Sequence, residues 1–273
     1  MSDVTSQGSV QSEDGTSIAF EYAGAGPGLI LIEAAGHYRA FSSFGTLARL
    51  LRSKFTVFRY DRRGRGDSGD TPPYAVHREI EDLSALIAEA GGSAYVYGFS
   101  SGALLALHAA AAGLDIPRLA VLEPPIGSDD TPPEGSEFTR NLSALVSAER
   151  HGEAVEYFNT SIGVPTEMLN EMRGTPAWSA MEAVAPTLAY DAACTGDNRP
   201  PADRFARISQ PVLVATGGAS AESFVGGGGA FFDNAADAIV AALPHAERTS
   251  IPGQWHQVDP KALAPFLVRF YEA

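Results

Sequence analysis

The sequence predicts an α/β protein with a mostly parallel eight-stranded sheet, helices on both faces, and a helical insertion after the sixth strand. Short apolar runs, such as Gly28–Ile32 and Pro211–Ala215, alternate with longer segments of helical spacing. Strand-like runs vanish over residues 128–207, where glycine and proline break helical stretches. Doubly wound sheets place their sites at the carboxyl ends of the strands, so we expect this insertion to be a lid over those ends. We therefore divide the chain into core residues 1–127, cap residues 128–207 and core residues 208–273.

The elements of the first half are predicted from turn chemistry and hydrophobic periodicity. Asp14 and Gly15 form a turn between two alternating runs, which predicts an antiparallel hairpin of residues 9–11 and 17–22. The unbroken apolar run 28–32 predicts a strand that is buried on both faces. We then expect a helix over 41–53, a strand over 55–60, a helix over 75–90, a strand over 95–97, a helix from residue 103 and a strand over 118–122.

The second half begins with the cap and returns to the strand pattern. Cap helices are expected over residues 137–148, 153–161, 166–172 and 177–193. The core resumes with a strand over 211–215, a helix over 234–242, a strand over 247–251 and a final helix over 260–271. Asp259 is predicted to cap the final helix, with Pro260 at its first position.

The composition argues against several classes of function. A hydrophobic content of 45% and a charged content of 19% are ordinary for a globular domain. The net charge of −14 leaves no basic stripe to bind nucleic acid and disfavours anionic membranes. Cys194 is the single cysteine, so no internal disulfide can form, and the N-terminus lacks the features of a signal peptide. We expect a cytoplasmic monomer or homodimer whose partner is a small hydrophobic substrate, with no nucleic-acid or membrane partner.

The stretch YVYGFSSGALLALHAA, residues 95–110, predicts a catalytic nucleophile. A strand that turns directly into a helix through G-x-S-x-G is a nucleophile elbow. Gly98 and Gly102 leave the room that this tight turn requires, and Ser100 is then exposed at the end of the strand. The N–H of Ser101 points to the place where an oxyanion forms, at the positive end of the helix.

These features together resemble the α/β-hydrolase-fold superfamily, and the resemblance covers residues 8–273. It rests on the order of elements, the elbow GFSSG, the loop YDRRGRGDSG after the fourth strand, and a histidine near the C-terminus. The YDRRGRGDS, LEPP and GGAS segments are similar to those of compact, helical-lidded, actinobacterial-type members. The resemblance implies the α/β-hydrolase fold with a lid after strand 6.

The resemblance also implies a base and an acid for Ser100. A serine needs a base near neutrality, and His256 lies in the loop after the last strand, where this fold places its base. The acid usually follows the strand PVLVAT, but no carboxylate stands in the turn after it. A second known position, after the preceding strand, is occupied by Glu123 in VLEPP, and we favour it. Glu222 as the acid, or no acid at all, remains open.

The oxyanion hole is expected to combine the Ser101 N–H with an N–H from the loop after the third strand. That loop usually contains His-Gly, whereas here it is EAAGH, which makes Ala35 or Ala34 the donor. Glu33 replaces the usual histidine, and a buried carboxylate is costly unless it is paired or protonated. Pairing of Glu33 with His37, contact with a polar group of the substrate, and simple exposure to water all remain open.

The arginine-rich loop DRRGRGDSGD is interpreted as structural. Its arginines and aspartates can pair among themselves and hold the loop against the sheet, while its glycines allow tight turns. No histidine, cysteine and aspartate cluster has metal-ligand spacing, and no G-x-G-x-x-G follows a strand. We therefore expect no metal and no cofactor.

The predicted substrate pocket is apolar and partly aromatic, because a lid turns one face toward the site. The predicted substrate-binding residues come from the core loops and from the cap. They are Glu33, His37, Phe99, Phe158, Trp178, Met181 and Trp255.

Three hypotheses of function follow. The first is a serine hydrolase that cleaves a small hydrophobic ester, lactone or thioester through an acyl-enzyme on Ser100. The second keeps this site for acyl transfer, C–C bond cleavage or cyclisation in natural-product metabolism. The third is a non-catalytic small-molecule receptor.

Overall fold

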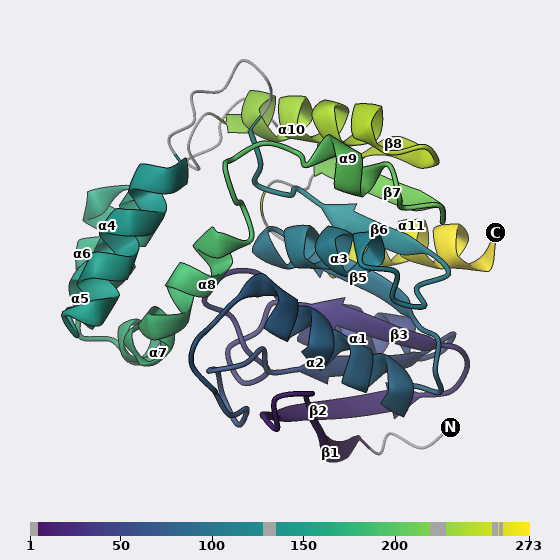
Figure 1. The fold of residues 1–273 in the computed structure, drawn as a ribbon, viewed down its shortest axis with the longest axis horizontal. Helices are drawn as coiled ribbons and strands as arrows, with labels where there is room; N and C mark the ends of the chain where they lie inside the picture. The colour runs from purple at the N-terminus through teal and green to yellow at the C-terminus, as the bar shows by residue number, and fades with distance from the viewer. Residues whose placement is uncertain (1–4, 128–134, 219–227, 253–255, 257–258) are drawn as a thin grey trace.

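A single twisted sheet forms the centre of the computed structural model, which describes residues 5–127, 135–218, 228–252, 256 and 259–273 (Figure 1). The described residues form eight strands in the order β1-β2-β4-β3-β5-β6-β7-β8. Pairing is antiparallel from β1 to β2 and from β2 to β4, and parallel from β4 onward. The mostly parallel eight-stranded fold that the sequence predicts is thus confirmed. The strands are β1 (Ser6–Gln11), β2 (Ser17–Gly24), β3 (Gly28–Ile32), β4 (Thr56–Tyr60), β5 (Tyr95–Phe99), β6 (Leu119–Leu122), β7 (Val212–Gly217) and β8 (Ala246–Ile251).

Helices cover both faces of the sheet, and an apolar core lies under each layer. On one face lie α2 (Val76–Glu89), α3 (Ser101–Ala111) and α10 (Gly228–Ala242), packed on a core that includes Ile30, Val96 and Val214. On the other lie α1 (Gly45–Leu51) and α11 (Pro260–Glu272), packed on a core that includes Leu29, Leu31 and Leu213. Every residue of β3 is buried, as its unbroken apolar run predicts.

The helix α11 begins with the N-cap residue that the sequence predicts, Asp259. The Asp259 side chain accepts the N–H of Lys261, and Pro260 lies in the first turn. Both features satisfy or remove N–H groups that have no acceptor within the helix.

The registers of β5, β6 and β7 bring their carboxyl ends to one place. Phe99 pairs with Leu122, and Leu122 pairs with Ala215. Hydrogen bonds continue this alignment beyond the strands, from the Ser100 N–H to the Leu122 carbonyl and from the Glu123 N–H to the Ala215 carbonyl. Residues that directly follow these three strands are therefore neighbours in space.

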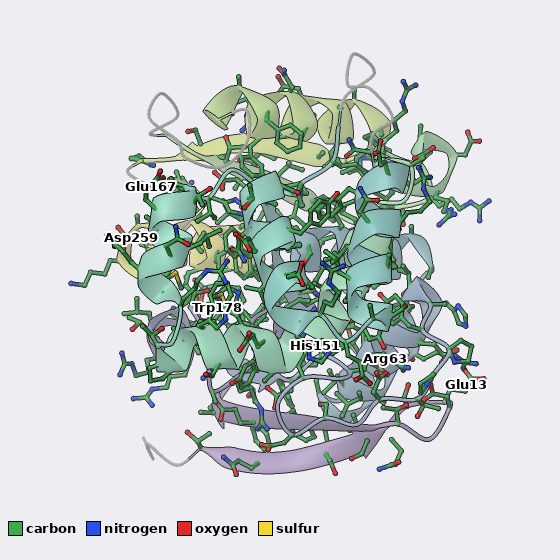
Figure 2. The ribbon with its side chains drawn as sticks, turned by 90° about the vertical axis from the view of Figure 1, so that its left-hand side faces the viewer. Glu13, Arg63, His151, Glu167, Trp178 and Asp259 are labelled. Atoms are coloured by element: carbon green, nitrogen blue, oxygen red, sulfur yellow. The ribbon has the colours of Figure 1, made fainter. Side chains whose placement is uncertain are left out.

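Most of the helices inserted between β6 and β7 form a cap at this edge of the sheet (Figures 1 and 2). They have their own apolar core, which includes Leu142, Val155, Trp178 and Leu188. The ring of Tyr190 stacks on Tyr74 of the core, with centroids 3.7 Å apart. The cap helices are α4 (Gly135–Ser147), α5 (His151–Ser161), α6 (Thr166–Met172), α7 (Pro176–Val184), a 3₁₀ turn (Ala185–Thr187) and α8 (Leu188–Ala193). The short helix α9 (Ala202–Phe205) leads back to β7, and its Phe205 packs in the core under the sheet rather than in the cap.

Two helices differ from the sequence prediction for local reasons. The helix expected over 177–193 is interrupted by the 3₁₀ turn, because Pro186 has no N–H to donate and its ring disfavours a continuous helix. The helix expected over 41–53 begins only at Gly45, because the Ser42 hydroxyl accepts the Phe44 N–H and competes with helical bonding.

Candidate active site

Ser100 lies on the strained turn that the elbow sequence predicts. Its backbone has φ 53° and ψ −123° between β5 and α3. A Cβ on Gly98 would lie 2.4 Å from the Gly102 carbonyl oxygen, and a Cβ on Gly102 would lie 2.4 Å from the Ile32 carbonyl oxygen. Both clashes would be with backbone carbonyl oxygens, which cannot shift as the end of a flexible side chain can, so the turn requires glycine on each side of Ser100.

Three side chains from the ends of different strands form a connected chain of hydrogen bonds. The Ser100 hydroxyl lies 3.4 Å from His256 Nε2, and His256 Nδ1 lies 3.0 Å from Glu123 Oε2. The serine–histidine distance is at the long end for a hydrogen bond, and such bonds often tighten only when substrate binds. The structure thus brings together the predicted nucleophile, base and acid. Glu222, the alternative acid, lies outside the described residues.

Glu123 is fixed by backbone donors as well as by the imidazole. Its Oε1 accepts the N–H of Gly217 at 2.8 Å, and its Oε2 also accepts the N–H of His256 at 2.9 Å. The side chain is only 2% exposed. Three bonds therefore hold this carboxylate in one orientation beneath the imidazole.

Backbone strain in the described part of the chain concentrates on these residues. Five non-glycine residues there have positive φ, and Ser100 (53°), Glu123 (48°) and His256 (31°) are three of them. Such conformations are costly and persist where the surrounding structure enforces them, which is typical of functional sites.

Aromatic rings enclose the imidazole of His256. The ring of Phe99 lies 5.0 Å away between centroids, and Phe232 of α10 stacks on the imidazole at 4.6 Å and 16°. Phe99 is a predicted site residue, whereas the sequence gives no sign of Phe232, which lies within a helix that has no motif. These contacts fix the imidazole plane and make its surroundings apolar.

The predicted oxyanion donors lie on the two segments that border Ser100. Ser101 is the first residue of α3, whose first-turn N–H groups have no acceptor within the helix. In the described part of the chain, the N–H groups of Ala34 and Ala35 have no backbone acceptor. The turn after β3 is closed by a bond from the His37 N–H to the Ala34 carbonyl.

His37 is held within that turn and does not reach Glu33. Its Nδ1 lies 2.8 Å from the Ala35 carbonyl oxygen, and its ring stacks on Phe41 with centroids 5.3 Å apart. Burial, together with the nearby Arg65, lowers the pKa of His37 below its ordinary value. The Nδ1 is therefore the protonated nitrogen of a neutral ring.

Glu33 is a buried carboxyl group, so two of the three open alternatives, exposure to water and pairing with His37, are wrong. The residue is 3% exposed, and the Ser42 hydroxyl donates to its Oε1. Its Oε2 is buried without a hydrogen-bond partner among the described residues. Burial raises the pKa of Glu33 to about 7, although the Ser42 bond, Arg59 and Arg65 act in the opposite direction. Its contact with substrate stays a prediction.

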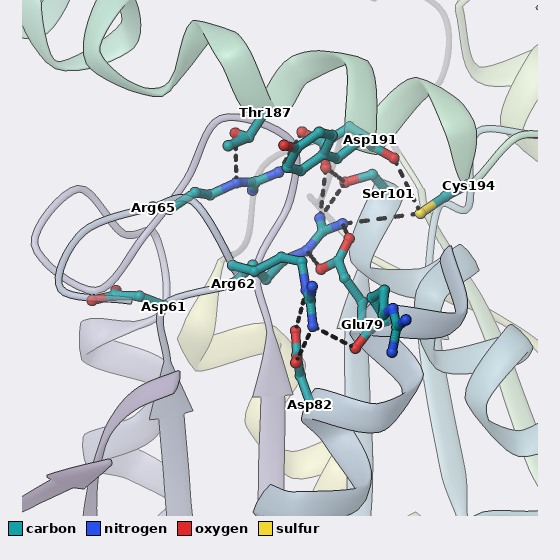
Figure 3. Close-up of polar contacts among 12 residues, drawn as sticks. Asp61, Arg62, Arg65, Glu79, Asp82, Ser101, Thr187, Asp191 and Cys194 are labelled. Carbon is teal, nitrogen blue, oxygen red and sulfur yellow. Dashed lines mark hydrogen bonds and ion pairs between the residues drawn. The ribbon is translucent and has the colours of Figure 1, made fainter. Parts of the chain in front are cut away.

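The arginines of the DRRGRGDSGD loop hold the loop in place, but not by pairing within it (Figure 3). This part of the interpretation is wrong, because their carboxylate partners come from other elements. Arg62 binds Glu79 of α2 and Asp191 of α8, Arg65 binds the same Asp191, and Arg63 binds Asp82 and Asp14. Arg39 in turn binds Asp61 and Asp67.

We call Arg62, Arg65, Glu79 and Asp191 the buried ion cluster, because each is at most 2% exposed. Neither Asp191 nor Glu79 belongs to a motif, and both were missed by reasoning from the sequence. A charged residue within the otherwise apolar run LAYDAAC is the signal that could have identified Asp191.

The predicted substrate-binding residues of the cap have different environments. Trp178 is 5% exposed and belongs to the cap core, where the guanidinium of Arg173 lies 4.8 Å from its ring (Figure 2). Phe158 and Met181 are partly buried against the same core. Trp255 lies outside the described residues. Their contact with substrate stays a prediction.

Two further features of the described residues bear on function. No group of three or more histidine, cysteine, aspartate or glutamate side chains there is arranged to hold a metal ion. None of the helices found there has the length and apolar character that a bilayer-spanning segment requires.

Comparison with known proteins places this geometry in a family. Residues 17–266 match the model of the alpha/beta hydrolase family. The chain is 49% identical to an alpha/beta hydrolase from Sphaerobacter thermophilus, over 97% of this chain and 100% of that one, with a TM-score of 0.85. A hydrolase from Pseudomonas aeruginosa (24% identity, 98% of both chains, TM-score 0.75) and an esterase from Thermogutta terrifontis (20% identity, 98% of both chains, TM-score 0.74) share the fold. Because the family model matches the chain from β2 through the elbow and the cap to α11, this chain belongs to the alpha/beta hydrolase family.

Proposed function

We propose that this protein is a serine hydrolase that cleaves a small, uncharged, hydrophobic ester, lactone or thioester through an acyl-enzyme on Ser100. The observation that carries the proposal is the hydrogen-bonded chain from Ser100 through His256 to Glu123. It has the order nucleophile, base and acid that acyl transfer requires.

The carboxylate determines which nitrogen of His256 acts as the base. Glu123 Oε2 accepts the proton on Nδ1, so Nε2 carries the lone pair that faces the Ser100 hydroxyl. As Ser100 Oγ attacks the substrate carbonyl, Nε2 takes its proton, and Glu123 stabilises the resulting imidazolium. His256 then returns the proton to the leaving group.

The tetrahedral oxyanion is stabilised by the N–H groups of Ala35 and Ser101. Each such donor typically contributes about 10²–10³ in rate, because it is aimed where charge develops. Collapse of the intermediate leaves an acyl group on Ser100, and His256 activates a water molecule to release it.

The apolar surroundings of the His256 imidazole favour an uncharged substrate. Phe99 and Phe232 pack around His256, and Phe41 stacks on His37 at the oxyanion turn. A charged acyl group next to these rings would lose its hydration without a partner, whereas an apolar one gains from burial.

The two other hypotheses have less support. The receptor hypothesis rests on the absence of an acid after PVLVAT. Because Glu123 bonds to His256 Nδ1 instead, this absence no longer argues against catalysis. Acyl transfer, C–C cleavage or cyclisation would use the same residues and is distinguished only by its products.

Covalent labelling tests the proposal directly. The protein is treated with a fluorophosphonate probe and digested, and the adduct is located by mass spectrometry, with Ser100→Ala as the matched control. A panel of p-nitrophenyl esters, lactones, thioesters and β-diketones is then assayed for turnover.

We expect an adduct on Ser100, turnover of at least one short ester, and loss of both in Ser100→Ala. Absence of an adduct from the folded protein would refute the covalent mechanism. Labelling of Ser100 with turnover of β-diketones but not of esters would favour C–C cleavage, and tight ligand binding without turnover would favour a receptor.

A further inference from the structure

The cap contributes one carboxylate to the core beside the nucleophile. Asp191 of α8 is 2% exposed and accepts hydrogen bonds from three donors (Figure 3). Its Oδ1 accepts from Arg62 Nη1 at 2.6 Å and from the Ser101 hydroxyl at 2.7 Å, and its Oδ2 accepts from Arg65 Nη2 at 2.6 Å. Burial alone would raise the pKa of Asp191, but Arg65 and Arg62 outweigh it and lower the pKa, so the group stays ionised.

The contact with Ser101 fixes one oxyanion donor. The Ser101 hydroxyl donates to Asp191 and accepts from Arg62 Nη1 at 3.2 Å, so the side chain is held from two directions. The same residue, the first of α3, carries one of the two N–H groups that the proposed function assigns to the oxyanion. Anchoring the side chain fixes the Cα, and with it the plane of the peptide that joins Ser100 to Ser101.

The contact with Arg65 fixes the other donor through a shared peptide group. Arg65 Nη1 donates to the Ala34 carbonyl at 3.1 Å and to the His37 carbonyl at 3.2 Å. In a trans peptide the C=O and the following N–H point in opposite directions. Arg65, by holding the Ala34 carbonyl, therefore turns the N–H of Ala35 to the opposite side.

The contacts of both Ser101 and Arg65 end at the Asp191 side chain. We propose that Asp191 is a positioning residue that aligns the two oxyanion N–H groups, of Ser101 directly and of Ala35 through Arg65. Docking of the cap helix α8 on the core thereby completes the oxyanion hole. The inference rests on the proposed function, because it assigns a role within the acyl-transfer site.

The chain offers a matched control for a role that is only structural. Asp82 of α2 is 1% exposed and binds Arg63 of the same loop through both oxygens, at 2.8 and 2.7 Å. The other bonds of Arg63 reach Asp14, Ser12 and the Arg78 carbonyl, none of which belongs to the oxyanion segments. Asp82→Asn therefore neutralises an equally buried ion pair without touching the proposed alignment.

The experiment compares Asp191→Asn, Ser101→Ala and Asp82→Asn with the wild-type protein. Each variant is measured for melting temperature, for kcat and KM on the best ester, and for inhibition by a trifluoromethyl ketone, which forms a tetrahedral oxyanion on Ser100. A non-reactive alcohol of the same shape reports binding without an oxyanion.

For Asp191→Asn and Ser101→Ala we expect kcat to fall by about 10- to 100-fold, somewhat less than removal of a whole oxyanion donor. The KM and the affinity for the alcohol should stay within about threefold of wild type, while ketone affinity falls in step with kcat/KM. Asp82→Asn should lower the melting temperature but keep kcat and ketone affinity within about threefold of wild type.

Three results separate failure of this inference from failure of the proposed function. If Asp191→Asn folds and matches Asp82→Asn in kcat and ketone affinity, the inference is wrong. If Asp191→Asn does not fold, Ser101→Ala decides, and unchanged kcat and ketone affinity there overturn the inference. If the wild-type protein turns over no ester and equals Ser100→Ala, the proposed function itself fails and the inference with it.

Discussion

Replacement of Glu33 by glutamine should change how the stability of the protein depends on pH. The carboxyl group of Glu33 is 3% exposed, and one of its oxygens has no hydrogen-bond partner among the described residues. Burial raises its pKa from 4.5 to about 7. The folded protein therefore holds a proton on Glu33 over a pH range in which the unfolded chain has released it.

The sign of the effect follows from linkage. Between pH 4.5 and about 7 the folded state binds more protons than the unfolded state, so stability is lost as pH rises through this window. A pKa rise from 4.5 to about 7, at about 1.36 kcal/mol per pH unit, corresponds to about 3 kcal/mol lost by about pH 8. Glutamine at this position does not titrate, so Glu33→Gln should escape that loss.

The assay is urea unfolding of wild type and Glu33→Gln at about pH 5 and about pH 8, with the exposed Glu89→Gln as control. The stability of Glu33→Gln relative to wild type should improve by about 2.5 kcal/mol from the lower pH to the higher, because a small part of the loss has already occurred at about pH 5. A constant offset at both pH values is expected from the altered hydrogen bonding and does not bear on the test. A relative stability that stays the same at both pH values, as for Glu89→Gln, would refute the reasoning.

Two further substitutions test the acid and the elbow. Glu123→Gln should lower kcat by up to about 10⁴-fold with the fold retained, because an amide has only one oxygen, and its NH2 group cannot accept a hydrogen bond either from the Gly217 N–H or from His256. Near-full ester turnover together with an unchanged melting temperature would show that Glu123 is not the acid. Gly102→Ala would place a Cβ 2.4 Å from the Ile32 carbonyl oxygen and 2.6 Å from that of Glu33. It should destabilise the protein by about 2 kcal/mol or more, as overpacking does, and a melting temperature equal to that of wild type would contradict the tight contact.

The features that the sequence predicts well are those that local chemistry determines. The elbow requires small residues beside Ser100 because backbone atoms approach closely on both sides, and such a requirement is visible in the short motif GFSSG. The N-cap of α11, Asp259, depends on local sequence in the same sense. The alternation of apolar strands and helices is sufficient to predict the sheet, since parallel strands are buried on both faces.

The features that the sequence does not predict depend on contacts between distant segments. Asp191 and Ser101 are separated by 90 positions, and only the docking of α8 brings them to 2.7 Å. The carboxylate partners of Arg62 and Arg65 lie on two helices, so composition within their own loop indicates the wrong pairs. Phe232 of α10 stacks on His256, which follows β8, and no pattern within either segment of the sequence indicates this contact.

The position of Glu123, the proposed acid, illustrates how the sheet register permits a displaced site residue. A carboxylate at the end of β7 is the usual arrangement that the resemblance implies, yet this strand ends in Thr216 and Gly217, and Gly218 follows it. Because β6 and β7 are neighbours in register, Glu123 at the end of β6 reaches both Gly217 at 2.8 Å and His256 at 3.0 Å. The end of β7 thus still takes part, as a backbone donor that orients the carboxylate from the adjacent strand. Moving the acid back to β7 would therefore require both the removal of Glu123 and a new partner for the Gly217 N–H, since a buried N–H left unpaired costs about 1–3 kcal/mol.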